Sequence, residues 1–231
     1  TRLQRQLNFL KHNPDHIAVG SNTILIDSED RITGRSQLPK FDHQLRWYCL
    51  LLNPIAHPTV MLRANMLKVN NLRYEESYFT SQDWELWSRC LAVGKMANIQ
   101  KPLLKQRIHA SSVSATKREL QISNSIRIQN SYLNTLTTPD RHIDFHIINK
   151  FFLGERETSQ KDYNKLLLSC EESLKLADQT FSALSYWQFI QLIVFITKRI
   201  IIMNRGHLIS KDFFLLIKMY LRKIIFKLRK K

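Results

Sequence analysis

The sequence has few cysteines, no Gly/Ser-rich linker and no long apolar run. Its three cysteines, Cys49, Cys90 and Cys170, are far apart and form no CxxC pair, so the pattern suggests neither a disulfide framework nor a zinc knuckle. The apolar run Leu192–Ile196 is far shorter than the roughly 20 residues that span a bilayer. The sequence therefore favours a protein of a reducing compartment that does not cross a membrane.

The composition is that of a folded protein, and the first residues have the spacing of a helix. With 231 residues, of which 44% are hydrophobic, the chain can bury a core and is not a disordered polypeptide. It begins at Thr1 rather than Met, and Leu3, Leu7 and Leu10 already have helical spacing. We therefore expect the sequence to begin inside a structural element, as a fragment of a longer protein does.

Positive charge is concentrated toward the C-terminal end. Residues Lys198–Lys231 carry eleven Lys and Arg side chains against the single acid Asp212, and so hold +10 of the formal net charge of +16. A basic segment of this kind attracts polyanions, and the candidates are nucleic acid and the anionic face of a membrane.

The apolar residues of this basic segment distinguish between the two candidates. On a helix over residues 213–231 they fall on one face, and the basic side chains occupy the rest of the circumference, which suits a bilayer interface. The alternative is a helix that packs on its own domain and exposes its basic face to solvent. No RNA-binding motif is recognisable, so no nucleic acid is expected as a partner. The apolar face consists of Phe213, Ile217, Tyr220, Leu221, Ile224, Ile225 and Leu228.

The first half of the chain alternates strand-like and helix-like segments, whereas the part beyond Ser114 is helical in pattern. This predicts an α/β portion, residues 1–115, followed by an all-helical C-terminal extension, residues 116–231. Each proline in 53–58 disfavours helical backbone at the residue before it, so this segment is expected to be extended. Short strands are predicted at 17–20, 23–26, 59–62, 95–99 and 103–107, and helices at 44–52, 64–69 and 83–93.

The acidic run Asp27-Ser28-Glu29-Asp30 lies between two strand-like segments. It resembles a metal-binding Asp-x-Asp loop. Acids between strands are nevertheless most often turn formers, and we predict a turn there.

Asp83 stands where polar loop residues give way to a helix-like run. Two interpretations of this position are open. The side chain can cap the helix by accepting a free backbone N–H of its first turn. It can also be a catalytic base at the edge of a cleft, where a carboxylate takes the proton of a hydroxyl nucleophile.

Several blocks of residues occur in the order seen in bacterial family 2 glycosyltransferases, and the chain resembles the second half of such a domain up to about residue 130. Each block is weakly specific, whereas the ordered set is specific. The blocks are Arg2-Leu3-x-x-Gln6, Asn13-Pro14-Asp15, Val19-Gly20-Ser21, Asn53-Pro54-Ile55-x-His57-Pro58-Thr59-Val60-Met61, Leu72-Arg73-Tyr74-Glu75, Gln82-Asp83-Trp84-Glu85-Leu86-Trp87-x-Arg89, Gly94-Lys95-x-Ala97-Asn98 and Arg107-Ile108-His109-x-x-Ser112-x-Ser114.

The resemblance implies a partial GT-A fold, a Rossmann-like α/β sandwich that binds a nucleotide-sugar donor and inverts the anomeric centre. It implies a saccharide or lipid-linked acceptor in the synthesis of a bacterial surface polysaccharide, such as lipopolysaccharide or capsule. A cytoplasmic protein, peripheral on the inner face of the membrane, fits the basic segment 213–231, which would contact the anionic membrane surface.

The resemblance also implies roles for individual residues. Asp83 is the general base, and Gln82 stands where family members often have Glu, so that Asp83 is the only acid of the pair. Gln82 and Arg107 are counted among the donor- or acceptor-binding residues, with Arg107 offsetting phosphate charge. Trp84 can offer its ring to a sugar. His57 lies between two prolines and is either such a binding residue or a hydrogen-bonded buried histidine.

A divalent metal, Mg²⁺ or Mn²⁺, is implied as well, because the leaving nucleoside diphosphate develops negative charge. By the resemblance His109 ligates this metal, although an isolated histidine after a strand is by itself more often structural. The family's main metal motif, an Asp-x-Asp, and its nucleotide-binding strands precede the block that begins at Arg2, and this sequence contains no substitute for them.

Without this donor-binding half the sheet would have unpaired edges, so we expect the segment alone to be poorly stable and inactive. The functional prediction therefore concerns the longer protein. The alternative hypothesis is a non-catalytic, basic helical protein that binds a membrane or RNA and uses the α/β portion as a scaffold.

Overall fold

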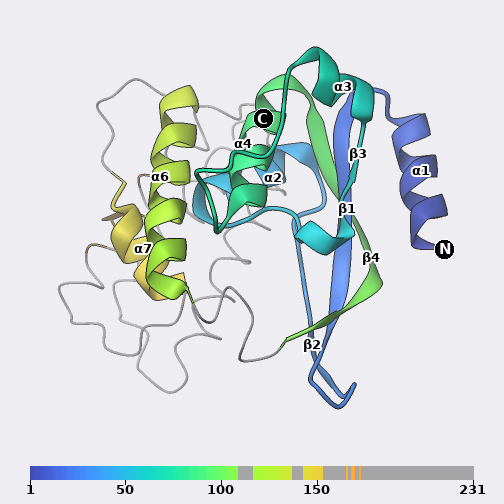
Figure 1. Cartoon of the computed structure of the whole chain (residues 1–231), viewed down its shortest axis with the longest axis horizontal. Coiled ribbons are helices and arrows are strands. Elements are labelled where there is room, and N and C mark those ends of the chain that lie inside the picture. Colours follow the sequence, from blue (N-terminus) through green and yellow to red (C-terminus); the bar gives the residue numbers. More distant parts are fainter. Residues whose placement is uncertain (109–116, 137–142, 153–164, 166–167, 170–171, 173–231) are drawn as a thin grey trace, which may run out of the picture. The chain divides into compact units, whose positions relative to one another are not determined.

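The structure, a computed structural model, describes residues 1–108, 117–136, 143–152, 165, 168–169 and 172 (Figure 1). The chain divides into two compact units, Thr1–Asp140 and Arg141–Lys231. The predicted basic helix 213–231 lies outside the described residues. The predicted division of the chain between residues 115 and 116 stays a prediction.

The first unit is built on a four-stranded sheet in which the central strand, β1, pairs with every other strand. β4 runs parallel to β1 along most of its length, whereas β2 and β3 are antiparallel to it. β3 pairs with β1 near its start, at Ala18 and Val19, and β2 pairs near its end, at Ile24 to Ile26, so the two short strands meet β1 at different positions along its length (Figure 1). The strands are β1 His16–Ile26, β2 Ile32–Arg35, β3 Met61–Leu62 and β4 Lys95–Arg107.

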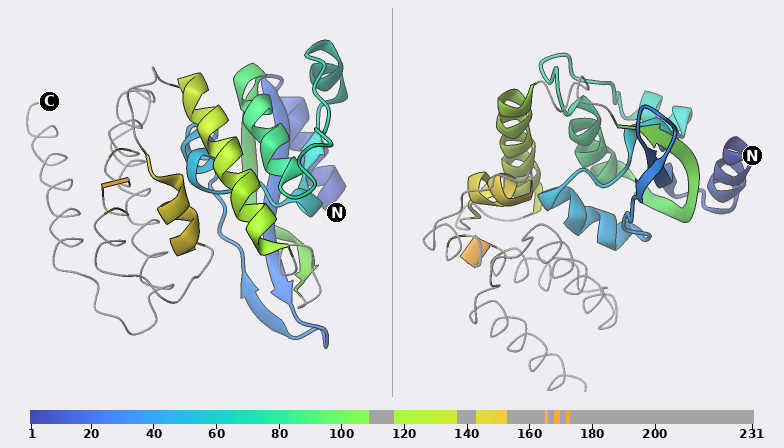
Figure 2. Two further views of the ribbon diagram at one scale, coloured as in Figure 1. Left: turned by 60° about the vertical axis from the view of Figure 1, so that its left-hand side comes forward. Right: turned by 90° about the horizontal axis from the view of Figure 1, so that it is seen from below.

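Helices cover both faces of this sheet. α1 packs on one face, α2 and α4 pack on the other, and α6 lies over α2 and α4 as an outer layer (Figures 1 and 2). This layered arrangement confirms the α/β class predicted from the sequence. The helices are α1 Arg2–His12, α2 Asp42–Leu51, α3 Ala64–Val69, α4 Gln82–Val93 and α6 Arg118–Leu136.

β1 and β4 are each one strand, so the prediction of two short strands in each region is wrong. Ser21 and Asn22 separate the two predicted halves of β1, yet both are buried within the strand. The Asn22 amide donates to the carbonyl of Gln100 at 2.9 Å, and its oxygen accepts the backbone N–H of Leu38 at 2.9 Å. These bonds satisfy the buried amide where Asn22 pairs with Pro102 at a register shift.

Two loops of the first unit were predicted with different success. The acidic run forms the expected turn, because Asp27 Oδ1 accepts the backbone N–H groups of Glu29 at 2.9 Å and Arg31 at 3.0 Å. The segment 53–58 is not extended throughout, since His57–Thr59 form a 3₁₀ turn with a proline near its start. A proline fits there because its missing N–H would have no partner in a first turn.

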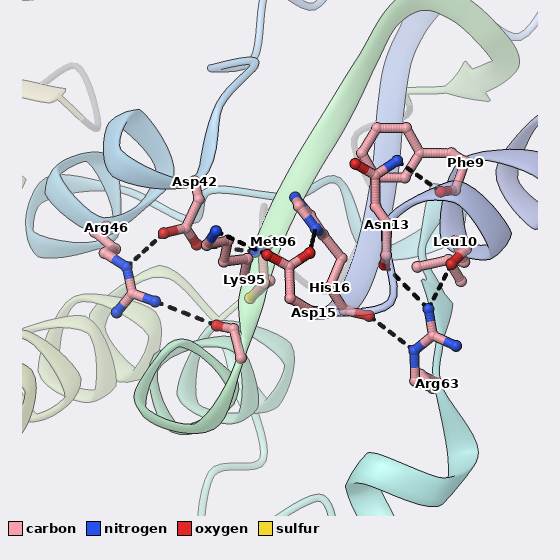
Figure 3. A network of polar contacts seen from close by, with 11 residues as sticks. Phe9, Leu10, Asn13, Asp15, His16, Asp42, Arg46, Arg63, Lys95 and Met96 are labelled. Atoms are coloured by element: carbon pink, nitrogen blue, oxygen red, sulfur yellow. Dashed lines mark hydrogen bonds and ion pairs between the residues drawn. The ribbon is translucent and has the colours of Figure 1, made fainter. Parts of the chain in front are cut away.

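The ends of α1 and α4 are capped by arginines from other elements. Arg63, which follows β3, donates to the carbonyl oxygen of Leu10 near the end of α1 at 2.6 Å (Figure 3). Arg46 on α2 donates to the carbonyl oxygens of Leu91 at 2.6 Å and Gly94 at 3.2 Å. The last carbonyls of a helix have no partner within the helix, so these charged donors satisfy groups that would otherwise need water.

The end of α2 is capped in the same way by the helices packed against it. Trp84 Nε1 on α4 donates to the carbonyl oxygen of Cys49 at 2.9 Å, and the Gln129 amide on α6 donates to that of Leu51 at 3.1 Å. Both donors are buried, which makes these bonds hard to replace by water. The position of the chain directly after α2 therefore depends on α4 and α6.

Asp15 joins the beginnings of β1 and β4. Its carboxylate contacts Lys95 Nζ and His16 Nδ1, each at 2.7 Å (Figure 3). These bonds, above all that to Lys95, lower the pKa of Asp15 from 3.8 to about 2. Because the folded pKa lies below the unfolded one, the stabilisation is fully present above pH 3.8 and is lost as the pH falls through about 2. We expect an NMR titration of Asp15 to show this low midpoint, and Lys95→Met to raise it.

The control for this titration is Lys101→Met, which removes an exposed cation farther along β4. It should leave the Asp15 midpoint where it is in the wild type. An ordinary midpoint of 3.8 in the wild type would show that the ion pair with Lys95 does not form in solution.

In the second unit the structure describes α7 Phe145–Phe152 and a few residues beyond it. Asp144 precedes the helix, and its Oδ1 accepts the backbone N–H of Ile147 at 3.1 Å, which is the bond of an N-cap. The Asp144 N–H donates to Ser169 Oγ at 3.0 Å. Among the described residues no helix is both long enough and apolar enough to cross a membrane.

Candidate active site

Asp83 lies in the first turn of α4 and is half-buried. Its Oδ2 accepts a hydrogen bond of 2.7 Å from the side-chain amide of Asn53, which follows α2 in the chain. The residue at the N-cap position is Ser81, with left-handed backbone at a φ of 65°. Within the described residues, the carboxylate of Asp83 thus binds a side chain and not a backbone N–H of the helix. The geometry does not support the capping interpretation.

Asn98 on β4 holds the loop that carries Asn53. Its buried amide donates to the carbonyl oxygens of Pro39 at 2.8 Å and Pro54 at 2.9 Å. The oxygen of the Asn53 side chain accepts the N–H of Ile55 at 3.3 Å, an Asx-type turn. The sheet therefore fixes the loop, and the loop fixes the amide that binds Asp83.

An aromatic group lies beside Asp83. His57 Nε2 and the Tyr74 hydroxyl share a hydrogen bond of 3.0 Å, and the buried Trp87 ring packs edge-on against both rings, with centroid distances of 6.2 and 6.5 Å. Trp87 is one helical turn after Asp83, so the two side chains share a face of α4. Both His57 and Tyr74 are exposed. Because His57 is exposed, the interpretation as a hydrogen-bonded buried histidine is wrong, and the interpretation as a binding residue stays a prediction.

The surroundings of Tyr74 raise the pKa of its side chain. Partial burial raises the pKa of its phenol, and the neighbouring Asp83 carboxylate raises it further. The phenol therefore stays protonated at neutral pH and can donate a hydrogen bond. The result is a carboxylate next to an exposed phenol and an exposed imidazole, which together offer polar and aromatic contacts to a sugar-sized molecule, while the buried Trp87 ring supports them from below.

Trp84 does not face this cluster. Its side chain is 4% exposed, and its indole N–H is bonded to α2. The prediction that its ring stacks on a sugar is wrong for this structure, because the ring fills the interface between α2 and α4. Gln82 is the first residue of α4 and is half-buried beside Asp83 in the chain.

Arg107 lies at the end of β4, where it binds the turn between β1 and β2. It donates to the carbonyl oxygen of Asp27 at 2.5 Å and to Asp30 Oδ1 at 2.7 Å. The structure thus gives Arg107 a structural partner and leaves its predicted phosphate contact a prediction. His109 lies outside the described residues.

A ligand set for the expected divalent metal is not found in the described part of the chain, where no three or more His, Cys, Asp or Glu side chains gather at one point. A hollow of about 330 Å³ lies elsewhere, between α1 and the second half of β4. Its lining includes Arg5 and Lys105 but none of the predicted site residues. We favour the Asp83 cluster as the site because it combines a carboxylate with groups that bind hydroxyls.

Asn53 and Tyr74 are the site residues that reasoning from the sequence missed. Both stand in blocks that carry the resemblance, Asn53-Pro54-Ile55 and Arg73-Tyr74-Glu75. Their place in these blocks was the sign in the sequence that could have identified them as site residues. The bond from Asn53 to Asp83 joins segments 30 residues apart, and a sequence pattern does not show it.

Two known proteins that are similar to this chain are both named glycosyltransferases. No protein-family model matches the sequence. Over 202 residues, 82% of this chain, it is 26% identical to an uncharacterized glycosyltransferase of Haemophilus influenzae, and the match covers 60% of that protein. Over 109 residues, 46% of this chain, it is 30% identical to an uncharacterized glycosyltransferase of Methanocaldococcus jannaschii, with 37% of that protein covered. The chain is thus similar to glycosyltransferases, and each match spans less than two thirds of the relative.

Proposed function

We propose that the protein containing this chain is an inverting glycosyltransferase of the family 2, GT-A type, with Asp83 as its general base. It moves a sugar from a nucleotide-sugar donor to a hydroxyl of a saccharide or lipid-linked acceptor. The observation that carries the proposal is the half-buried Asp83 carboxylate, held by Asn53 beside the exposed His57–Tyr74 pair. The similarity to two glycosyltransferases supports the reaction class.

The chemistry follows from what a carboxylate does for an alcohol. An acceptor hydroxyl is a weak nucleophile until a base within hydrogen-bond reach removes its proton. In the proposed step the Asp83 carboxylate takes this proton while the acceptor oxygen bonds to the anomeric carbon. The bond from that carbon to the diphosphate breaks, and its electron pair leaves with the nucleoside diphosphate. Attack from the face opposite the leaving group inverts the anomeric centre.

The cluster beside the base is proposed to bind the acceptor. The exposed imidazole of His57 and the hydroxyl of Tyr74 can hydrogen-bond sugar hydroxyls, and the Tyr74 ring can lie against the apolar side of a sugar. On the donor side, His109 is proposed to ligate a divalent metal and Arg107 to offset phosphate charge. The basic segment 213–231 is proposed to hold the protein at the inner membrane surface, where a lipid-linked acceptor of surface-polysaccharide synthesis would lie.

The full-length protein can test this function directly. It is incubated with a panel of nucleoside diphosphate hexoses and with saccharide and lipid-linked acceptors. The expected result is release of nucleoside diphosphate that requires an acceptor, together with a product whose anomeric configuration, read by NMR, is opposite to that of the donor. Turnover of no donor in the panel would contradict glycosyl transfer, and a product of retained configuration would contradict the single displacement.

A further inference from the structure

We infer that Asn53 is a positioning residue that sets the orientation of the Asp83 carboxylate for proton removal. This inference rests on the proposed function of Asp83 as the base. It adds to the proposed site a residue from the loop after α2, and it explains why that residue is an asparagine.

The two ends of the Asn53 side chain are both engaged, which fixes the direction of its amide. The oxygen accepts the N–H of Ile55 at 3.3 Å, so the nitrogen must be the end that faces Asp83. That nitrogen donates to Asp83 Oδ2 at 2.7 Å, a short bond to a charged acceptor. With Oδ2 occupied, Oδ1 is the carboxylate oxygen that can receive the acceptor proton.

The support of Asn53 extends into the sheet. Pro54, the next residue, has its carbonyl oxygen bound by the amide of Asn98 at 2.9 Å. Asn98 is 2% exposed and lies on β4 opposite Gly20 of β1. The position of the Asp83 carboxylate is therefore set by a chain of hydrogen bonds that begins at a buried residue of the sheet. A base held by such support needs little reorganisation when the substrate binds.

An uncharged donor suits this task better than a cation does. An amide orients a carboxylate without neutralising its charge, so the carboxylate keeps its ability to take a proton. Other charged and titratable groups lie near this end of α4. Tyr74 stays protonated and shares a hydrogen bond of 3.0 Å with His57. Glu85 is paired with Arg89 at 2.6 Å, and Arg127 of α6 stacks on the Tyr78 ring.

The decisive variant is Asn53→Asp in the full-length protein. Aspartate keeps the oxygen that binds Ile55 N–H and so preserves the turn, but it replaces the donor to Asp83 with a second carboxylate. Two carboxylates at this distance cannot both be ionised easily. We expect kcat to fall about 10²-fold with little change in the acceptor KM, and the acidic limb of the pH–rate profile to move to higher pH.

Two further variants complete the test. Asn53→Ala removes the donor without adding charge, so it should lower kcat similarly. It should move the acidic limb to higher pH by less than Asn53→Asp does, because losing a hydrogen bond to the ionised carboxylate disfavours that form. Asn70→Asp introduces the same charge change at an exposed site at the end of α3 and should leave both kcat and the profile unchanged. Circular dichroism and thermal unfolding report whether each variant is folded.

The outcomes separate this inference from the function on which it rests. If Asp83→Asn retains wild-type turnover, the proposed base is wrong. If Asp83→Asn is inactive but folded Asn53→Asp retains the wild-type kcat and pH profile, the positioning role is wrong and the base remains. A lowered kcat and a shifted acidic limb in Asn53→Asp support the positioning role.

Discussion

Replacing Asp83 by Asn in the full-length protein is expected to lower kcat for sugar transfer by about 10²–10⁴-fold, the contribution of a positioned general base. Asparagine has nearly the same shape, and its side-chain oxygen can still accept the bond from Asn53, so the fold should be unaffected. The substitution removes only the capacity to take a proton. The measurement is the steady-state rate of nucleoside diphosphate release with saturating acceptor.

The matched control is Glu76→Gln, which neutralises an exposed carboxylate in the loop that precedes α4. It should turn over at the wild-type rate, because the lost charge lies outside the contacts of Asp83. Near-equal rates for Asp83→Asn and Glu76→Gln would remove Asp83 from the mechanism.

Replacing Gly20 by Ala is expected to have the largest effect on stability. A methyl group there would collide with Asn98 Oδ1 and lie 2.7 Å from Ile55 Cγ2, both in the support of the Asn53 loop. Because neither neighbour is a flexible chain end free to move, we expect a loss of about 1–3 kcal/mol in the free energy of unfolding. Urea denaturation followed by circular dichroism measures it, and the displaced loop should lower kcat as well.

Gly34→Ala is the control for this substitution, since its added methyl group would meet Leu25 Cδ1 at an ordinary contact distance of 3.5 Å. Gly34 lies on β2, away from the Asn53 loop. We expect its unfolding midpoint to stay close to that of the wild type. Equal stability of the two alanine variants would mean that Gly20 is not needed to make room for the side chains of Asn98 and Ile55.

Much of the first unit follows from local patterns in the sequence. α3 begins and ends where its spacing predicts, and α4 starts one residue earlier than predicted and ends before Gly94 as expected. The division of β1 and β4 into halves failed because Asn22 and Pro102 are turn-forming residues in most contexts. Here a hydrogen bond from the Asn22 side chain to the carbonyl oxygen of Gln100 joins β1 and β4 at the register shift, so both strands continue past it. No local pattern in the sequence shows such a bond.

The site was predicted in part. Asp83 was found because a carboxylate at the start of a helix is visible in the sequence. The prediction for Trp84 failed because the alternation of polar and aromatic residues at the start of α4 does not show which ring faces α2. Trp84, Trp87 and Leu91 are buried and share one face of the helix, which was a usable sign that Trp84 belongs to the core. The contact with Asn53 depends on the tertiary fold, which a single sequence does not display.

The caps on α1, α2 and α4 bear on how the molecule opens. Each cap is a side chain that lies 35 to 78 residues away in the chain, so the end of one helix cannot fray without releasing a donor from another part of the unit. The first unit should therefore loosen as one cooperative body rather than helix by helix. Because Asn53 comes shortly after the capped end of α2, the bonds that hold this end to α4 and α6 also restrict the loop that orients the Asp83 carboxylate.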